Sequence, residues 1–222
     1  MKLVFYSGGC HNLNEELDAE AVRLLKEHSS NPRLTYIPSD SRKKKHYFEE
    51  FKRYWRKYGI RRIEPFAADD HYTPKDLRHA LSADGVFLSG GNTYYFTKSL
   101  RDRGFFSRLR EYARKGGVLL GLSAGAIIMT PSITTASIPS DDPDENYVEL
   151  ANWKSLALVK FEFSPHYTRR KRVALELMRY SKKFRGPIYS APDGGGIVVN
   201  GHRTVFVGRV ACFFQGHQMP TK

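Results

Sequence analysis

Short apolar runs alternate with amphipathic segments through the first 130 residues of the chain. The expected strands cover residues 2–6, 33–39, 60–66, 85–92 and 118–122. The expected helices cover residues 14–28, 42–58, 73–81, 104–117 and a segment that starts at 124. Alternation of this kind is typical of βαβ units, in which helices cover a parallel sheet.

The pattern changes after Met129. Residues 156–163 predict one strand and residues 169–183 predict a helix. Three short runs follow, at residues 187–190, 196–200 and 204–208, and glycine-rich turns separate them, which is typical of antiparallel strands. No repeat, linker or change of composition divides the chain. We therefore expect one α/β domain over residues 1–222, with a mostly parallel sheet, helices on both faces and antiparallel strands towards the C-terminus.

The chain is strongly basic, with 36 Lys and Arg against 23 Asp and Glu and a formal net charge of +13. The charge is densest in helix 42–58, where Phe48, Phe51, Trp55 and Tyr58 recur at helical spacing. Such a helix either packs its aromatic stripe on a sheet or contacts nucleic acid. The first interpretation is favoured, because nothing else in the chain resembles a nucleic-acid module, and nucleic acid is not expected as a partner.

The sequence predicts a soluble, cytoplasmic protein without a membrane partner. It contains no run of about 18 apolar residues and no signal-peptide pattern. Its two cysteines, Cys10 and Cys212, lie far apart without metal-ligand spacing. Cys10 follows two glycines and is either a reactive thiol or an ordinary free cysteine. The acidic run at 141–145 lacks the spacing of a calcium loop, and no metal or cofactor is expected.

Residues 121–125, GLSAG, form the pattern of a nucleophile elbow between a strand and a helix. In that turn Ser123 stands at the carboxyl end of a central strand, and the helix that starts at Ala124 directs its first N–H groups to the same place. The alternative is a tight turn of small residues without a chemical role.

A serine nucleophile needs a base and an acidic partner for that base. Among the eight histidines, His166 comes directly after a predicted strand and a proline, and Asp193 follows another short strand. Gly90 and Gly91 end an inner strand and leave backbone N–H groups open for a second oxyanion donor. Asn92 or Thr93, beside them, is a candidate for capping the next helix, and Asn92 is also a candidate for binding substrate.

The segments SGGNT, GLSAGA, SPHY and APDGG, in this order, resemble the peptidase E family of serine dipeptidases, which is related to cyanophycinase. The resemblance covers most of the chain. It implies a class I glutamine-amidotransferase-like fold, with Ser123 as nucleophile, His166 as base, and the amides of Gly91 and Ala124 as the oxyanion hole. It also implies the hydrolysis of short peptides, with a preference for an N-terminal aspartate.

The chain departs from the family pattern at two places. The acidic residue of the P-[DE]-G segment is often glutamate in the family and is Asp193 here, so Asp141 or Asp142 remains an alternative third member. The segment after His166 is short, and Arg169 is the residue that corresponds to a substrate-binding arginine of the family. An arginine would pair with a substrate carboxylate.

Two other functions remain open from the sequence. An esterase of the α/β-hydrolase type has the order Ser, acid, His, and would need Asp193 followed by His202 or His217. We expect His202 in a hairpin turn and His217 in a frayed terminus, so this order is disfavoured. A non-catalytic protein that binds nucleic acid or other anions is the second alternative. The sequence gives no indication of oligomeric state.

Overall fold

A seven-stranded sheet in the order β3-β2-β4-β5-β1-β8-β9 forms the centre of the protein. The computed structural model describes residues 1–222 apart from 10–12, 28, 141 and 222, and apart from the side chains of 43–45. The strands of this sheet are β1 (Lys2–Tyr6), β2 (Arg33–Ile37), β3 (Arg62–Pro65), β4 (Gly85–Leu88), β5 (Val118–Leu122), β8 (Gly196–Asn200) and β9 (Arg203–Val207). β1 to β5 are parallel and β8 and β9 are antiparallel, which confirms the predicted mostly parallel sheet.

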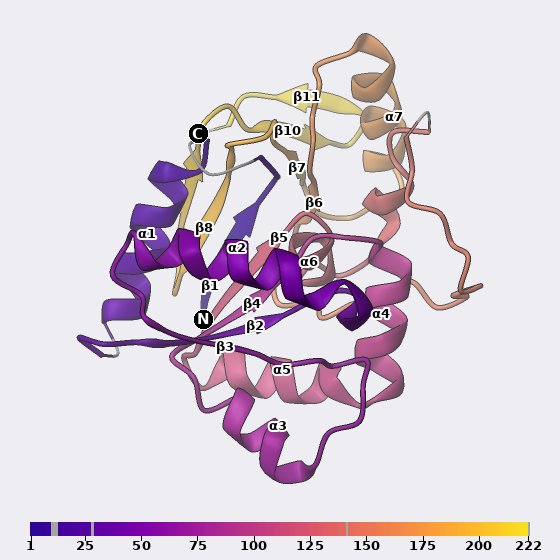
Figure 1. The fold of residues 1–222 in the computed structure, drawn as a ribbon. Helices are drawn as coiled ribbons and strands as arrows, with labels where there is room; N and C mark the ends of the chain where they lie inside the picture. The colour runs from indigo at the N-terminus through magenta and orange to yellow at the C-terminus, as the bar shows by residue number, and fades with distance from the viewer. Residues whose placement is uncertain (10–12, 28, 141, 222) are drawn as a thin grey trace.

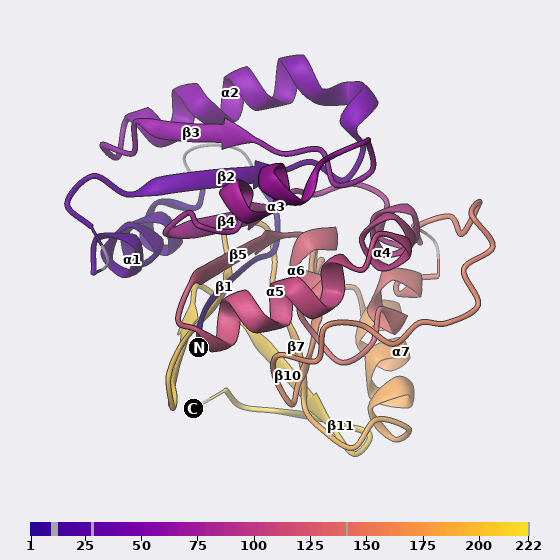
Figure 2. The same cartoon turned by 90° about the horizontal axis from the view of Figure 1, so that it is seen from below.

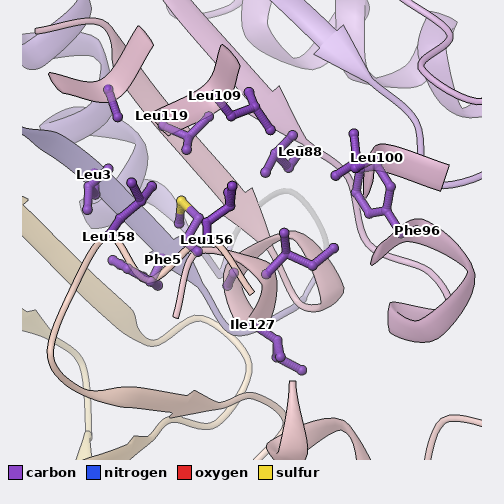
Figure 3. Close-up of a cluster of buried hydrophobic side chains, with 14 of the residues drawn as sticks. Leu3, Phe5, Leu88, Phe96, Leu100, Leu109, Leu119, Ile127, Leu156 and Leu158 are labelled. Carbon is purple, nitrogen blue, oxygen red and sulfur yellow. The ribbon is translucent and has the colours of Figure 1, made fainter. Parts of the chain in front are cut away.

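Helices cover both faces of this sheet (Figures 1 and 2). They are α1 (Glu15–Lys26), α2 (Lys44–Arg56), α3 (Pro74–Ala80), α4 (Thr93–Asp102), α5 (Phe105–Arg114) and α6 (Ala124–Ile128), whereas α7 (Lys171–Ser181) packs elsewhere. Successive side chains of a strand point to opposite faces, so Val4 and Tyr6 pack with α1 and α2 while Leu3 and Phe5 pack with α4, α5 and α6. Figure 3 shows part of the core that Leu3 and Phe5 share with α4, α5 and α6. None of the described helices is both long and apolar enough to span a membrane.

A second sheet, in the order β11-β10-β7-β6, lies with α7 at one end of the molecule (Figure 1). Its strands are β6 (Glu162–Ser164), β7 (Ile188–Ser190), β10 (Ala211–Phe214) and β11 (His217–Met219). Leu177 of α7 packs there against Ile188 and Phe213. The sequence patterns did not indicate this sheet or its last two strands. Of the predicted antiparallel strands towards the C-terminus, β8 and β9 extend the central sheet, whereas β7 belongs to the second sheet. The prediction of a frayed terminus at His217 is wrong, because this residue lies in β11.

The predicted strand over residues 156–163 is wrong for most of its length, because β6 begins at Glu162. Leu156 and Leu158 are buried, which accounts for the strand-like alternation. Their amides, however, donate to the carbonyls of Ile128 and Met129 at 3.0 Å each. The segment therefore satisfies the carboxyl end of α6 instead of pairing with a neighbouring strand.

Glu162 on β6 is fully buried, and neither carboxylate oxygen has a hydrogen-bond partner among the described residues. Burial raises the pKa of this carboxyl from an ordinary 4.5 to about 7. The hydroxyl of Tyr180 lowers the pKa, but by less than burial raises it. The folded protein therefore holds a proton that the unfolded chain releases between these two pH values. Stability from the neutral form is complete below pH 4.5 and is lost as the pH rises through about 7.

Glu162→Gln is expected to remove this pH dependence. Relative to wild type, the free energy of unfolding of the variant should rise by about 3 kcal/mol between pH 4.5 and pH 8, since each pKa unit corresponds to about 1.4 kcal/mol. Urea unfolding at several pH values measures this difference, with Glu16→Gln on the exposed face of α1 as the control. A constant difference across the range would contradict the prediction.

Candidate active site

Ser123 stands in a sharp turn between β5 and α6. Its backbone has φ 50° and ψ −110°, and its amide donates to the carbonyl of Tyr6 at 2.9 Å. A Cβ atom on Gly121 would lie 2.5 Å from the backbone of Gly125, and one on Gly125 would lie 2.2 Å from the carbonyl oxygen of Leu88. Only glycine fits at these two positions, which is the physical reason for the GLSAG pattern. The turn has the shape of a nucleophile elbow.

Ser123, His166 and Asp193 form a continuous hydrogen-bonded chain. The Oγ of Ser123 lies 2.9 Å from Nε2 of His166, and Nδ1 of His166 lies 2.7 Å from Oδ1 of Asp193. An ionised carboxylate can only accept, so Nδ1 carries the proton and Nε2 is free to accept from the serine hydroxyl. The imidazole and the carboxylate are about half exposed, so a substrate can reach them. The three residues are thus arranged as nucleophile, base and orienting acid.

Two residues that the sequence patterns missed, Ser7 and Gly8, hold this chain in place. The Ser7 hydroxyl donates to the carbonyl of Ala191 and accepts from the His166 amide, both at 2.7 Å. A Cβ atom on Gly8 would lie 2.3 Å from the imidazole of His166 and 2.4 Å from the carboxylate of Asp193. The sequence feature that could have indicated them is the SGG segment directly after β1. Because β1 is parallel to β5, both strands end at the same edge of the sheet, so this segment lies close to Ser123.

His166 itself has a backbone φ of +57°, which is rare for a residue with a side chain. The amide of the next residue, Tyr167, donates to the carbonyl of Ala191 at 2.9 Å and ties the loop down. Strain of this kind persists only where neighbouring contacts impose it. The loop therefore places the imidazole between the serine and the carboxylate.

The candidate oxyanion loop lies beside the serine. A Cβ atom on Gly90 would lie 3.6 Å from the Cβ of Ser123, and one on Gly91 would lie 2.1 Å from the Oγ of Ser39. The Ser39 hydroxyl also donates to the carbonyl of Gly90 at 2.7 Å. Gly91 has a φ of +137°, and Ala124 opens α6 directly after the nucleophile. Glycine is thus required at 91, where a side chain would meet Ser39 and where the backbone is left-handed, whereas the space at 90 would admit a Cβ atom in ordinary contact with Ser123.

Asn92, Asp144 and Glu145 hold the start of α4. Oδ1 of Asn92 accepts from the amide of Tyr95 at 2.9 Å, and its Nδ2 donates to the carbonyl of Glu145 at 2.8 Å. Asp144 accepts from the amide of Thr93 at 2.8 Å. The capping role expected for Asn92 is confirmed, whereas its substrate-binding role stays a prediction. Within the described ranges there is no cluster of three or more metal-ligating side chains.

Of the two alternative acidic residues, the structure describes Asp142, and the carboxylate that contacts Nδ1 of His166 is that of Asp193. Asp142 is exposed, and its amide donates to the carbonyl of Pro139 at 3.2 Å. Asp141 and Cys10 lie outside the described residues. Arg169 follows His166 in the same loop, with φ +58° and an exposed side chain.

The triad of an α/β-hydrolase would need His202 or His217 as its base, and the structure places neither histidine beside Ser123. His202 lies in the turn between β8 and β9, next to Asn200, which pairs with Lys2 at the start of β1. Ser123, by contrast, adjoins Tyr6 at the other end of β1. His217 belongs to the second sheet. Neither histidine therefore shares an edge of the central sheet with the nucleophile.

A cavity of about 490 Å³ opens beside the serine, and α2 forms one of its walls. Trp55 of α2 is buried against the sheet, and the partly buried rings of Phe48 and Phe51 belong to the same core. The predicted packing of this basic helix by its aromatic stripe is confirmed. The helix also has a role that periodicity did not indicate, because Tyr47, Phe51 and Tyr54 line the cavity.

Sequence comparison shows which family the chain belongs to. The sequence model of peptidase family S51 matches residues 3–207. The chain belongs to this family. This S51 member is 30% identical over 157 residues to the uncharacterized peptidase Lin0382 of Listeria innocua, a match that covers 67% of the chain and 72% of the relative. It is 32% identical over 88 residues to a peptidase E of Escherichia coli O1:K1, covering 39% of the chain and 35% of that protein.

Two crystal structures share the fold of this S51 chain. A protein assigned to peptidase E from Listeria monocytogenes EGD-e superposes with a TM-score of 0.71 and 24% identity, covering 93% of the chain and 97% of that protein. A peptidase from an acI-B1 Actinobacterium superposes with a TM-score of 0.66 and 14% identity, covering 99% and 96%. The family match confirms the resemblance to peptidase E, and the protein is a serine-type peptidase.

Proposed function

We propose that this peptidase hydrolyses dipeptides and other short peptides through a Ser123–His166–Asp193 triad. The observation that carries the proposal is the continuous hydrogen-bonded chain from the Ser123 hydroxyl to the Asp193 carboxylate. The cavity is lined by Leu122, the residue before the serine, and by Gly90 and Gly91, but not by the three triad residues themselves. The volume of about 490 Å³ lies in the range of sites for small ligands, which favours a short peptide over a long extended one.

The steps follow from the positions of the three side chains. His166 takes the proton of Ser123 through Nε2 while Oγ attacks the scissile carbonyl carbon. The protonated imidazole, held by Asp193, then gives that proton to the departing amine, which leaves an acyl group on Oγ. A water molecule attacks the ester carbon, His166 accepts its proton, and the Ser123 hydroxyl is restored as the acid product leaves.

The negative charge on the carbonyl oxygen needs donors fixed before the reaction. We assign this role to the amides of Gly91 and Ala124. Support for the assignment comes from the close approach of the Gly90–Gly91 loop to Ser123, and from the position of Ala124 at the first turn of α6, where N–H groups have no partner within the helix.

A preference for an N-terminal aspartate would depend on Arg169. This side chain follows the catalytic histidine in an exposed loop, and it is not among the described residues that line the cavity. The preference therefore stays a prediction that a peptide panel must test.

Active-site labelling and peptide hydrolysis together test the proposed function. We expect a fluorophosphonate to modify Ser123 stoichiometrically, because only a serine activated by a base reacts readily with such a probe. Peptide mapping by mass spectrometry locates the label, and chromatography measures the products released from free dipeptides. Excess dipeptide should slow the labelling. Labelling at other serines, or none, together with no hydrolysis of any dipeptide, would overturn the proposal.

A further inference from the structure

The cavity beside Ser123 continues the site towards α1 and α2. Leu122, the residue before the nucleophile, lines it, as does Gly90, whose backbone lies against Ser123. A group that fills this cavity while the serine attacks is therefore part of a residue next to the scissile bond. The shape and charge of the cavity therefore affect which peptides the enzyme accepts.

The cavity walls are aromatic. They include Tyr36, Phe51, Tyr54, Trp55 and Phe87. The ring centroids of Tyr36 and Phe51 are 4.5 Å apart, and those of Phe51 and Phe87 are 4.6 Å apart. Flat aromatic surfaces suit the methylene stem of a long side chain and also attract a cation at its end.

The inner end of the cavity presents hydrogen-bond acceptors. Asp18, only 1% exposed, accepts from the hydroxyls of Tyr6 and Tyr58 at 3.1 Å each and from that of Tyr54. Oδ1 of Asn14, in a side chain 7% exposed, has no donor among the described residues. Burial raises the pKa of Asp18, and a cationic partner would offset that cost of burying its charge.

The charge of the lining is opposite to that of the protein. The whole chain carries +13, yet the charged residues that line the cavity in the described part of the chain are Asp18, Asp40 and Glu50. At the mouth, the exposed Arg42 donates to both carboxylate oxygens of Asp40, at 2.9 and 2.8 Å, and lies over the ring of Tyr95. A substrate carboxylate at the inner end would be repelled by Asp18 and could not donate to Oδ1 of Asn14. A cationic group could pair with the charge of Asp18 and donate a hydrogen bond to Asn14.

We propose that this cavity binds the side chain of a lysine or arginine next to the scissile bond, with its stem along the aromatic walls and its charged end towards Asn14 and Asp18. The inference rests on the proposed function, since it assigns a specificity to the same serine. Asp18 and Asn14 are specificity-determining residues, and the three tyrosine hydroxyls position the Asp18 carboxylate.

Dipeptides that differ only in charge test this specificity. Arg-Ala and citrulline-Ala have nearly the same shape, and we expect kcat/KM to be about 10- to 100-fold higher for Arg-Ala, the range expected for one hydrogen-bonded charge. Lys-Ala against norleucine-Ala, the reversed dipeptides and Asp-Ala complete the panel. Equal rates for the charged and neutral members of every pair, or a preference for Asp-Ala, would overturn the inference.

Asp18→Asn tests the assigned residue. We expect the Arg-to-citrulline ratio of kcat/KM to fall towards one, and we expect Glu16→Gln, on the same helix but exposed, to keep the wild-type ratio and rate. An unchanged ratio in folded Asp18→Asn would overturn the role of Asp18. Thermal unfolding shows whether the variant is folded, and the wild-type comparison of charged and neutral substrates stands without it.

Binding to Ser123→Ala separates this inference from the proposed function. Calorimetry with Arg-Ala and citrulline-Ala should give at least tenfold tighter binding of Arg-Ala. If this holds while wild type cleaves no peptide, the proposed function fails and the cation site stands. If wild type cleaves dipeptides without regard to side-chain charge, the proposed function stands and the cation site fails. Both dipeptides carry the same α-amino group, so a preference for Arg-Ala over citrulline-Ala assigns the bound cation to the side chain.

Discussion

Ser123→Ala is expected to lower kcat for dipeptide hydrolysis by roughly 10⁵- to 10⁶-fold. In the proposed triad His166 activates this hydroxyl, whose Oγ lies 2.9 Å from Nε2. No neighbouring hydroxyl can take over, because the turn at φ 50° holds this position alone against the imidazole. The remaining rate would come from substrate binding and oxyanion stabilisation, which the substitution leaves in place.

Steady-state kinetics with the best dipeptide of the panel measure the change. Ser107→Ala is the matched control, because Ser107 is an exposed serine of α5 whose hydroxyl donates to the carbonyl of Gly104. It should keep wild-type kcat and KM. If Ser123→Ala stays within tenfold of wild type while folded, Ser123 is not the nucleophile.

The edge of the sheet at which the site lies could be predicted from the sequence. Parallel strands of a βαβ pattern carry their carboxyl ends to one edge, so residues that follow predicted strands were candidates for a common site. Ser123 and Gly90 follow β5 and β4, and both lie at that edge. His166 and Asp193 follow β6 and β7, which belong to the other sheet, yet the structure brings both side chains into one hydrogen-bonded chain with Ser123. Their catalytic roles stay predictions.

The features that could not be predicted from the sequence are those that arise from contacts between segments far apart in the chain. The supporting role of Ser7 arises because its hydroxyl meets the His166 amide and the Ala191 carbonyl, and no local pattern encodes that meeting. Likewise, periodicity shows that Phe51 and Trp55 share a face of α2, but it does not show that Asp18 of another helix lies at the end of the same cavity. The second sheet was missed because its strands are short and pair across long stretches of chain.

Asp193→Asn is expected to lower kcat by about 10⁴-fold with little change in fold. The carboxylate accepts from Nδ1 of His166 at 2.7 Å and so keeps Nε2 unprotonated for the serine. An amide of the same shape can instead donate to Nδ1, which moves the proton to Nε2 and leaves the serine without a base. The loss should appear in kcat more than in KM, because the imidazole acts on the reacting group rather than on the bound peptide.

Asp142→Asn is the matched comparison, since Asp142 is the described alternative for the third role. It is exposed and remote from the Nδ1 contact, so its replacement should leave kcat within about twofold of wild type. Kinetics of both variants on one dipeptide, with the rate of fluorophosphonate labelling as a second readout, distinguish the two carboxylates. A large loss in Asp142→Asn with near-normal activity in Asp193→Asn would transfer the orienting role to the loop that follows η2 (Thr134–Ser137). The 2.7 Å contact between Asp193 and His166 favours the opposite outcome, because an imidazole nitrogen already bound to one carboxylate has no second proton for another.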